Sequence, residues 1–218
     1  MAKASEPDQA RGEGLEHYFT QRPEARSRPV EMRTEVRGLS LMLVTDRGVF
    51  SHGKVDAGSR LLAETMELPE DGELLDWGCG WGLLGIVAAL TWPLARVTMV
   101  EVNERACDLA RANAERNEAA RVEVLCGDAA QVLGDRQFDA IICNPPISAG
   151  RAAVLAMMAN VAEHLRPQGC FWMVAHTKKG AKTLQRELES YFAEVEQVRM
   201  RGGYRVFKTA RSLPQGGL

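Results

Sequence analysis

The chain has 218 residues, of which 45% are hydrophobic and 26% are charged. This composition is ordinary for a globular protein, and the length suits one main domain whose core needs neither disulfides nor a metal ion. The formal net charge of −2 excludes a strongly basic protein, so any binding of nucleic acid must depend on local clusters of charge.

The cysteine spacing and the apolar segments indicate the cellular compartment and bear on metal and membrane binding. The five cysteines stand far apart without C-x-x-C spacing, which argues against a disulfide framework and a zinc site, and the four histidines show no metal spacing. The N-terminus lacks the apolar segment of a signal peptide, and the longest apolar stretch, 82–95, is too short to span a bilayer. We therefore expect a cytoplasmic protein without metal or membrane contact, and we favour a monomer.

The N-terminal part predicts a tail and an extension. Residues 1–14 are polar and are expected to be a disordered tail, and residues 15–68 are expected to pack on the core as an extension. The extension begins with a short helix or loop that reaches residue 37. Apolar segments 39–44 and 49–51 then flank an Asp-x-Gly turn, which predicts a β-hairpin, and a helix follows.

Residues 69–212 alternate strand and helix character and form the predicted main domain. Strands are expected at 73–77, 96–102, 122–126, 138–143 and 170–175. Helices are expected at 83–90, 104–117, 129–133, 151–165 and 181–191. Strands separated by helices of this length pair in parallel.

The end of the domain breaks this alternation. Segments 195–200 and 204–209 flank Arg201-Gly202-Gly203, which is typical of an antiparallel hairpin. The sequence thus predicts an α/β fold: a doubly wound, mostly parallel seven-stranded sheet with a C-terminal antiparallel hairpin and an N-terminal β-hairpin extension.

The first strand of the domain leads into a turn with the sequence Asp76-Trp77-Gly78-Cys79-Gly80-Trp81-Gly82. A sharp strand-to-helix turn against a ligand requires glycine, because side chains would block the approach or the left-handed dihedral angles. The amides at the start of the helix can then bind the ligand. We predict that the turn holds a nucleoside cofactor through Asp76, Gly78, Cys79, Gly80 and Gly82.

The same turn leaves a dinucleotide as an alternative ligand. Residues 80–85 match G-x-G-x-x-G, and Glu101 ends the next strand. Two observations favour a methionine-containing nucleoside instead. Asp76 stands two residues before the first glycine, where an acid can receive the amino group of a methionine moiety, and nothing that resembles a hydride-transfer site follows.

Polar residues also stand at the ends of the next two strands. Glu101 is placed to accept both hydroxyls of a ribose, and the alternative is a surface acid at a strand end. Asn103 can contact the same ribose or cap the helix that follows. Asp128, with Ala129 after it, can bind the amino group of adenine, cap the next helix, or do both.

The sequence Asn144-Pro145-Pro146-Ile147 follows the strand at 138–143. An aromatic or amide nitrogen is a poor nucleophile because its lone pair is delocalised. The Asn144 side-chain oxygen and the Pro145 carbonyl can accept its two hydrogens and aim the lone pair at a methyl group, and the paired prolines hold these acceptors in place. The alternative is an ordinary Pro-Pro turn. We predict that Asn144, Pro145 and Pro146 are catalytic and that Asn144 also contacts the cofactor.

The C-terminal segment 197–218 contains five basic residues and no acid. The predicted hairpin would gather Arg199, Arg201 and Arg205 around one tip, where they could bind RNA phosphates. The alternative is a solvated face whose arginines form ion pairs with Glu194 and Glu196.

With these residues in view, the chain resembles small-domain S-adenosylmethionine-dependent methyltransferases related to bacterial ribosomal-RNA guanine-N2 methyltransferases. The resemblance covers about residues 17–210. Besides the two motifs, it rests on His17-Tyr18-Phe19-Thr20, Gly48-Val49-Phe50-Ser51, Lys54-Val55-Asp56-Ala57-Gly58-Ser59, Val102-Asn103-Glu104-Arg105-Ala106 and Gly203-Tyr204-Arg205-Val206.

This resemblance implies a class I methyltransferase fold, S-adenosyl-L-methionine as cofactor, ribosomal RNA as partner, and methylation of the exocyclic N2 of a guanine. Glu101 stands where Asp is more usual in the group. Asp56, Gly58 and Ser59 match a segment expected near the methyl-donor end of the cofactor. Members of the group often carry a second, inactive N-terminal copy of the domain that helps to bind RNA, whereas this sequence contains one copy.

Related groups leave alternatives open. Protein glutamine-N5 and DNA adenine-N6 methyltransferases share the clamp but usually have an aromatic residue where this chain has Ile147. Ile147 keeps an apolar wall for the substrate, and Phe50, Tyr18 or Phe19 could supply the missing stacking unless they belong to the core. A third alternative is a catalytically silent RNA-binding factor on the same fold, against which the intact acids and Asn144 argue.

Overall fold

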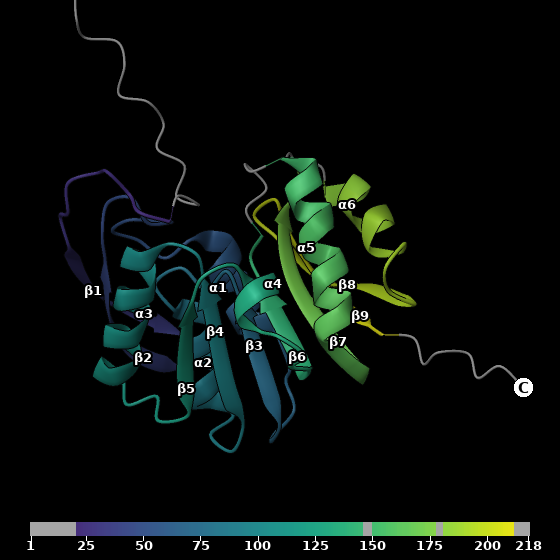
Figure 1. Ribbon diagram of the computed structural model, residues 1–218, viewed down its shortest axis with the longest axis horizontal. Coiled ribbons are helices and arrows are strands. Elements are labelled where there is room, and N and C mark those ends of the chain that lie inside the picture. The colour runs from purple at the N-terminus through teal and green to yellow at the C-terminus, as the bar shows by residue number, and fades with distance from the viewer. Residues whose placement is uncertain (1–20, 146–149, 178–180, 212–218) are drawn as a thin grey trace, which may run out of the picture.

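The computed structural model describes residues 21–145, 150–177 and 181–211 (Figure 1). The predicted tail at 1–14, the segment 17–20, and Pro146 and Ile147 lie outside the described residues. The described chain forms one seven-stranded sheet, helices on both of its faces, and a separate two-stranded sheet.

The main sheet has the strand order β5-β4-β3-β6-β7-β9-β8. Its parallel strands are β3 (Glu73–Trp77), β4 (Arg96–Glu101), β5 (Val122–Cys126), β6 (Phe138–Cys143) and β7 (Leu165–His176). The strands β8 (Glu194–Arg201) and β9 (Tyr204–Ala210) are antiparallel to each other, and β9 is antiparallel to β7. The doubly wound sheet with a C-terminal antiparallel hairpin is therefore confirmed.

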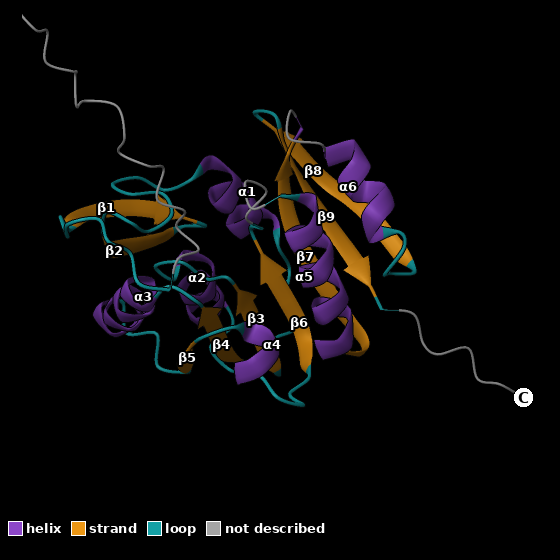
Figure 2. Ribbon diagram, turned by 45° about the horizontal axis from the view of Figure 1, so that its top comes forward, coloured by secondary structure: helices purple, strands orange, loops and turns teal. Residues whose placement is uncertain are grey.

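Helices cover both faces of this sheet (Figures 1 and 2). On one face, the first buried apolar cluster includes α1 (Ala57–Thr65), α2 (Leu83–Thr91) and α3 (Glu104–Arg116). On the other face, the second cluster includes α4 (Ala129–Val132), α5 (Arg151–His164) and α6 (Ala181–Leu188). The strands supply alternate residues to the two clusters; in β3, Leu74 packs in the first and Leu75 in the second. This burial on both faces explains why the strands are continuous apolar runs.

The ends of most elements agree closely with the predicted ones. The largest differences are that β7 begins at Leu165, upstream of the predicted start, and that α6 ends at Leu188, before the predicted end. Within the described ranges, none of the helices has the length and apolarity needed to cross a bilayer.

The N-terminal hairpin exists, but its predicted location was wrong. Strand β2 (Leu39–Thr45) does not pair with 49–51; it pairs with β1 (Val30–Val36), in the segment that was expected to be a helix or loop. The Asp-x-Gly segment instead forms a loop in which the buried Asp46 carboxylate accepts hydrogen bonds from the chain upstream of β1.

The turn of this hairpin is formed by Arg37 and Gly38, which both have positive φ, at 53° and 75°. A non-glycine residue rarely adopts this conformation, so the sequence signal for the turn is weak. The Arg37 guanidinium group donates hydrogen bonds to the carbonyls of Ala63 at 3.2 Å and Met66 at 2.8 Å, at the end of α1. Contacts with a distant helix therefore stabilise the turn, which local sequence cannot reveal.

Two asparagines, Asn113 in α3 and Asn117 at its C-terminal cap, bind the hairpin to the domain. Asn113 exchanges two hydrogen bonds with the backbone of Val44, at 2.7 and 2.9 Å, and donates a third to the Trp81 carbonyl at 2.9 Å. Asn117, one turn later, exchanges the equivalent pair with the backbone of Met42, at 2.9 and 2.8 Å. Asn113 is fully buried, whereas Asn117 is partly exposed.

The substitution Asn113→Ala is expected to lower the free energy of unfolding by on the order of 2–4 kcal/mol, because it leaves buried backbone groups of Val44 and Trp81 without partners. Asn117→Ala is the matched control. It removes the equivalent pair of bonds with Met42, and one bond to the Asn113 carbonyl at 2.8 Å, at a position more open to water, so its cost should stay below about 1 kcal/mol. Urea denaturation measures both values, and equal losses would contradict the role given to burial.

Candidate functional site

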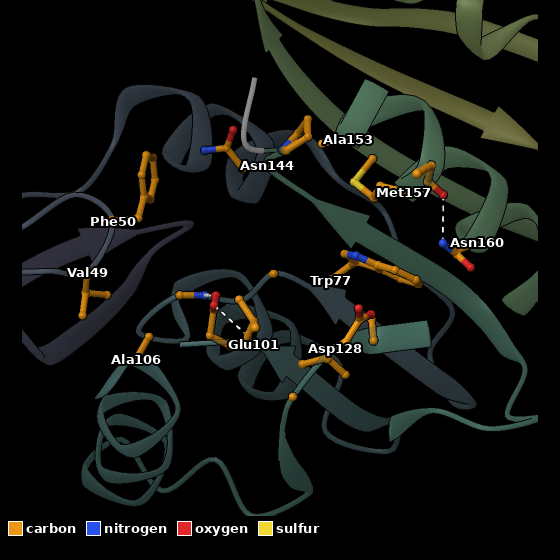
Figure 3. Close-up of a pocket in the computed structure, with 18 residues that line it drawn as sticks. Val49, Phe50, Trp77, Glu101, Ala106, Asp128, Asn144, Ala153, Met157 and Asn160 are labelled. Carbon is orange, nitrogen blue, oxygen red and sulfur yellow. Dashed lines mark hydrogen bonds between the residues drawn. The ribbon is translucent and has the colours of Figure 1, made fainter. Parts of the chain in front are cut away.

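A pocket of ≈ 370 Å³ opens at the carboxyl ends of β3, β4, β5 and β6 (Figure 3). Strand β3 lies between β4 and β6, so the strand order reverses at this point. Ligands of doubly wound sheets bind at such a reversal, outside the carboxyl ends of the strands. Figure 3 shows Phe50 and Asn144 on one side of the pocket and Glu101 and Asp128 on the other.

The glycine turn forms part of the pocket wall. Gly78 and Gly80 line the pocket, with φ of 71° and 56°. A Cβ atom built at either position would meet no atom within 4 Å, so a side chain there would project into open space. The amides of Gly78 and Cys79 donate to the Val100 carbonyl at 2.9 and 3.0 Å, which fixes the turn against β4. The turn is thus a rigid backbone cradle that a ligand can approach closely.

Two other residues of the turn, Cys79 and Gly82, do not line the pocket. Cys79 is only 9% exposed and packs in the first apolar cluster. Gly82 precedes α2 with a φ of 95°, and a Cβ atom there would lie 3.3 Å from Ala110 of α3. Gly82 therefore allows α2 and α3 to pack closely, and cofactor contacts of these two residues stay predictions.

Asp76 is completely buried at the start of the turn and does not itself line the pocket. Its Oδ2 accepts a hydrogen bond from the Gly85 amide at 2.8 Å, whereas its Oδ1 has no partner among the described residues. Burial raises the pKa of this carboxyl to about 7; the Gly85 bond opposes the rise, and the charge of Glu101 adds to it. Asp76 therefore holds an unused acceptor that fits the amino group of a ligand.

Glu101, at the end of β4, lines the pocket. Its Oε2 accepts from the Gly80 amide at 2.9 Å, and its Oε1 accepts from the amides of Val102 at 2.8 Å and Asn103 at 3.0 Å. Burial raises the pKa of Glu101, while these three amides favour the charged form. A carboxylate has about four acceptor positions, so one remains for a ligand hydroxyl. The contact with both ribose hydroxyls stays a prediction.

The other two polar candidates cap helices. Asn103 is fully buried, accepts from the Ala106 amide at 3.1 Å at the start of α3, and does not line the pocket. The structure therefore shows Asn103 as the N-cap of α3. Asp128 accepts from the Ala130 amide at 3.0 Å at the start of α4 and also lines the pocket, together with Ala129. Asp128 can therefore both cap the helix and contact a ligand.

Asn144 and Pro145 line the pocket at the carboxyl end of β6. The Asn144 Nδ2 donates to Asp56 Oδ2 at 3.0 Å and to Ser59 Oγ at 2.8 Å, both at the start of α1. Because both amide hydrogens are used, the side-chain oxygen remains available as an acceptor. The second half of the motif lies outside the described residues.

Of the three aromatic candidates for stacking, Phe50 lines the pocket. Its carbonyl accepts a hydrogen bond from the Trp81 indole at 2.8 Å, which holds the loop after β2 over the glycine turn. Tyr18 and Phe19 lie outside the described residues.

Sequence analysis missed one wall of the pocket. This wall consists of Trp77 and of one face of α5, formed by Ala153, Ala156, Met157 and Asn160 (Figure 3). Their spacing of i, i+3, i+4 and i+7 marks a single helix face and was visible in the sequence. Nothing in that spacing distinguishes a face that borders a pocket from one that packs in the core.

The tip of the β8–β9 hairpin lies at the same edge of the sheet as the pocket. His176, the last residue of β7, pairs with Tyr204, and the Thr177 amide donates to the Gly203 carbonyl at 2.7 Å. The carboxyl end of β7 and the turn of the hairpin are therefore adjacent. A polymer bound over the pocket could reach this tip.

The three arginines of the hairpin differ in their surroundings. Arg199 and Arg201 are exposed on β8. Arg205 is partly buried and donates to Gln197 Oε1 at 2.5 Å and to Thr177 Oγ1 at 3.4 Å. Among the residues that the structure describes, no ion pair joins these arginines to the glutamates of β8.

The cysteines behave as small apolar residues. All five are free thiols, and burial raises the pKa of Cys79 and Cys143. In the part of the chain that the structure covers, no group of three or more His, Cys, Asp or Glu side chains is arranged to hold a metal ion.

Comparisons with known proteins agree with this geometry. Residues 40–208 match the family model described as methyltransferase small domain. An uncharacterized protein of Bacillus subtilis, YbxB, is 37% identical over 198 residues, which are 90% of this chain and 98% of that protein. The ribosomal RNA small subunit methyltransferase C of Stutzerimonas stutzeri is 32% identical over 175 residues, which are 78% of this chain and 51% of that protein.

Among solved structures, a T. thermophilus 16S rRNA N2 guanine methyltransferase (RsmC), in complex with AdoMet and guanosine, superposes with a TM-score of 0.73 at 26% identity. The match covers 84% of this chain and 50% of that one. The chain therefore spans about half the length of the ribosomal RNA methyltransferases that it matches, and nearly all of the B. subtilis protein.

The buried carboxyl of Asp76 makes stability depend on pH. The native protein holds this proton up to about pH 7, whereas the ordinary pKa of the group is 3.8. The contribution of Asp76 to stability is therefore full below about pH 4 and is lost as the pH rises through about 7. The loss should be on the order of 4 kcal/mol, since a difference of one in pKa corresponds to about 1.4 kcal/mol.

Urea denaturation of the wild type and of Asp76→Asn between pH 4 and 8 measures this loss. The variant has no proton to lose, so it should gain stability relative to the wild type as the pH rises. Parallel curves across this range would show that Asp76 is not the titrating group.

Proposed function

Since the chain belongs to the methyltransferase small domain family, we propose that it methylates the exocyclic N2 amine of a guanine in ribosomal RNA. It is an S-adenosylmethionine-dependent methyltransferase, in keeping with its family and with the relative solved with AdoMet. One observation carries the proposal: the glycine turn with Glu101 and the Asn144-Pro145 pair line the same pocket. A nucleoside cofactor and an amine acceptor can therefore meet in one cavity.

The residues present fit the cofactor. The open space beside Gly78 and Gly80 admits a ligand against the backbone, and Glu101 has an acceptor position left for a ribose hydroxyl. The unpartnered Oδ1 of Asp76 suits the ammonium of a methionine moiety, and Asp128 at the start of α4 suits an adenine amine. When bound, S-adenosylmethionine supplies a methyl group on a sulfonium, which is already a good electrophile.

The residues at the other end of the pocket fit a planar amine. Asn144 Oδ1 and the Pro145 carbonyl can each accept one of its hydrogens, which holds the nitrogen lone pair out of conjugation with the ring. These acceptors also stabilise the positive charge that develops on the nitrogen as its bond to the methyl carbon forms. One amine proton then leaves to solvent. Because positioning supplies much of the rate, the site needs no strong base.

Three features favour a guanine in RNA as the acceptor. Two of the relatives reported above are named as ribosomal RNA methyltransferases, and one of these two was solved with guanosine. Phe50 gives the pocket an aromatic wall on the side of Asn144, so it can supply the stacking that Ile147 cannot. The exposed Arg199 and Arg201 lie near the hairpin tip at the same edge of the sheet, where they can bind phosphates.

The acceptor is identified by incubating the protein with S-adenosylmethionine and ribosomal RNA. The RNA comes from a strain in which the gene for this protein has been deleted. Mass analysis of the nucleosides should show N2-methylguanosine. Asn144→Ala should lower turnover by on the order of 10²–10³, because it removes an acceptor that matters most in the transition state. The Kd of the cofactor should change far less.

Asn160→Ala is the matched control, since Asn160 lines the same pocket but its Nδ2 donates to the Ala156 carbonyl of its own helix at 2.9 Å. It should lower turnover much less than Asn144→Ala. A methylated protein glutamine or N6-methyladenine as the product would refute the guanine acceptor. Near-normal turnover of Asn144→Ala would refute the clamp.

The basic hairpin is tested by the salt dependence of RNA binding. The double variant Arg199→Gln/Arg201→Gln should bind RNA more weakly, and the slope of log K against log salt should flatten by about 0.7–0.9 for each lost phosphate contact. Arg205 is left intact, because its bonds to Gln197 and Thr177 support the hairpin.

The control is Arg96→Gln/Arg121→Gln, which removes two exposed arginines at the opposite edge of the sheet, at the start of β4 and before β5. It should leave the slope unchanged. If both double variants bind RNA like the wild type across the salt series, the hairpin arginines are only a solvated face.

A further inference from the structure

Three segments far apart in the sequence meet at the side chain of Asn144. Asp56 and Ser59, at the start of α1, accept its two amide hydrogens at 3.0 and 2.8 Å. Tyr204, the first residue of β9, lies beside the same segment: a Cβ atom at Gly58 would meet both the Tyr204 ring at 2.8 Å and Asp56 Oδ2 at 3.0 Å. The C-terminal hairpin therefore packs next to the residues that bind Asn144.

The chemistry of these partners fixes which way the amide of Asn144 points. An ionised carboxylate can only accept hydrogen bonds, so Asp56 can face the NH₂ group of Asn144 but not its oxygen. Turning the amide over would place its oxygen against the carboxylate, with a repulsion and the loss of the bond to Asp56, whereas the Ser59 hydroxyl can donate as well as accept. An asparagine without such a neighbour could present either end of its amide.

The contact between Tyr204 and Asp56 depends on a missing side chain. A Cβ atom at Gly58 would lie 2.8 Å from the Tyr204 ring, so glycine is what lets the ring pack against the start of α1. His176 packs edge-on against the same ring, with the ring centroids 4.7 Å apart. Burial and the neighbouring Asp56 raise the pKa of Tyr204, so its hydroxyl remains a donor at neutral pH.

We propose that Asp56 is a positioning residue: with the Ser59 hydroxyl, its carboxylate fixes the amide of Asn144 so that the side-chain oxygen is left for the acceptor amine. Tyr204 packs beside this carboxylate across Gly58. The proposal rests on the function proposed above, and it extends that function from the clamp to the residues that orient it.

A structural role alone would not require a carboxylate here. Asp56 is also the N-cap of α1, where its Oδ2 accepts from the Ser59 amide at 2.9 Å. Asparagine caps a helix about as well as aspartate does. Asp56→Asn therefore keeps the helix cap and the shape of the side chain. It loses the carboxylate, which can accept hydrogen bonds but cannot donate them.

The kinetic test compares Asp56→Asn with the wild type. The variant should lower kcat by on the order of 10-fold to 10²-fold through misplacement of the clamp, with the KM for RNA, the cofactor Kd and the melting temperature unchanged. Ser59→Ala and Tyr204→Phe should cause smaller losses in kcat. When Asp56→Asn is added to Asn144→Ala, little further loss should follow, because Asp56 acts through Asn144.

A second readout needs no turnover. In an NMR spectrum, the side-chain amide signal of Asn144 is identified by its absence in Asn144→Ala. Its protons should exchange slowly with water in the wild type and faster in Asp56→Asn and Ser59→Ala. Equal exchange in all three proteins would show that these partners do not hold the amide.

The outcomes separate this inference from the proposed function. If the product is not methylguanine but a methylated glutamine or adenine, the guanine acceptor is wrong, and the coupling of Asp56 with Asn144 is measured on that acceptor instead. If no acceptor is methylated, the exchange measurement decides. Independent, multiplying losses from Asp56→Asn and Asn144→Ala, or a melting temperature that falls together with kcat, would reduce Asp56 to a helix cap and overturn the proposal.

Discussion

The site depends on the position of β3 between β4 and β6. The chain leaves β3 for α2 on one face of the sheet and leaves β6 for α5 on the other, so the two connections diverge and open a crevice between them. The glycine turn follows β3, and the Asn144-Pro145 pair follows β6. One topological feature therefore places the glycine turn and the Asn144-Pro145 pair side by side in one pocket.

Two acids at this crevice are held in different ways. Glu101 accepts hydrogen bonds from three backbone amides. These bonds offset the cost of burying the charge and hold the side chain against the glycine turn. Asp76 accepts only one and keeps a buried oxygen without a partner among the described residues. An unpaired buried polar atom is costly. A ligand that donates a hydrogen bond to this oxygen would relieve the cost.

The sequence predicted most of the sheet and the pocket wall at Gly78, Gly80, Glu101 and Asp128, because strand periodicity and glycine turns are local signals. The prediction from sequence failed where contacts between distant segments determine the structure. The N-terminal hairpin turns at Arg37, whose side chain binds the end of α1, and no local pattern marks that turn. The wall formed by α5 has the spacing of any buried helix face. The partners of Asn144, Asp56 and Ser59, come from the start of α1, so these hydrogen bonds became visible only once the two segments were placed together.

Calorimetric titration decides whether the turn between β3 and α2 holds S-adenosylmethionine. The wild type should bind one S-adenosylmethionine per chain. Gly80→Arg should abolish this binding while the fold persists, because a side chain at Gly80 projects into open space beside the pocket. An absence of heat with S-adenosylmethionine, together with tight binding of a nicotinamide dinucleotide, would show that the turn holds a different cofactor.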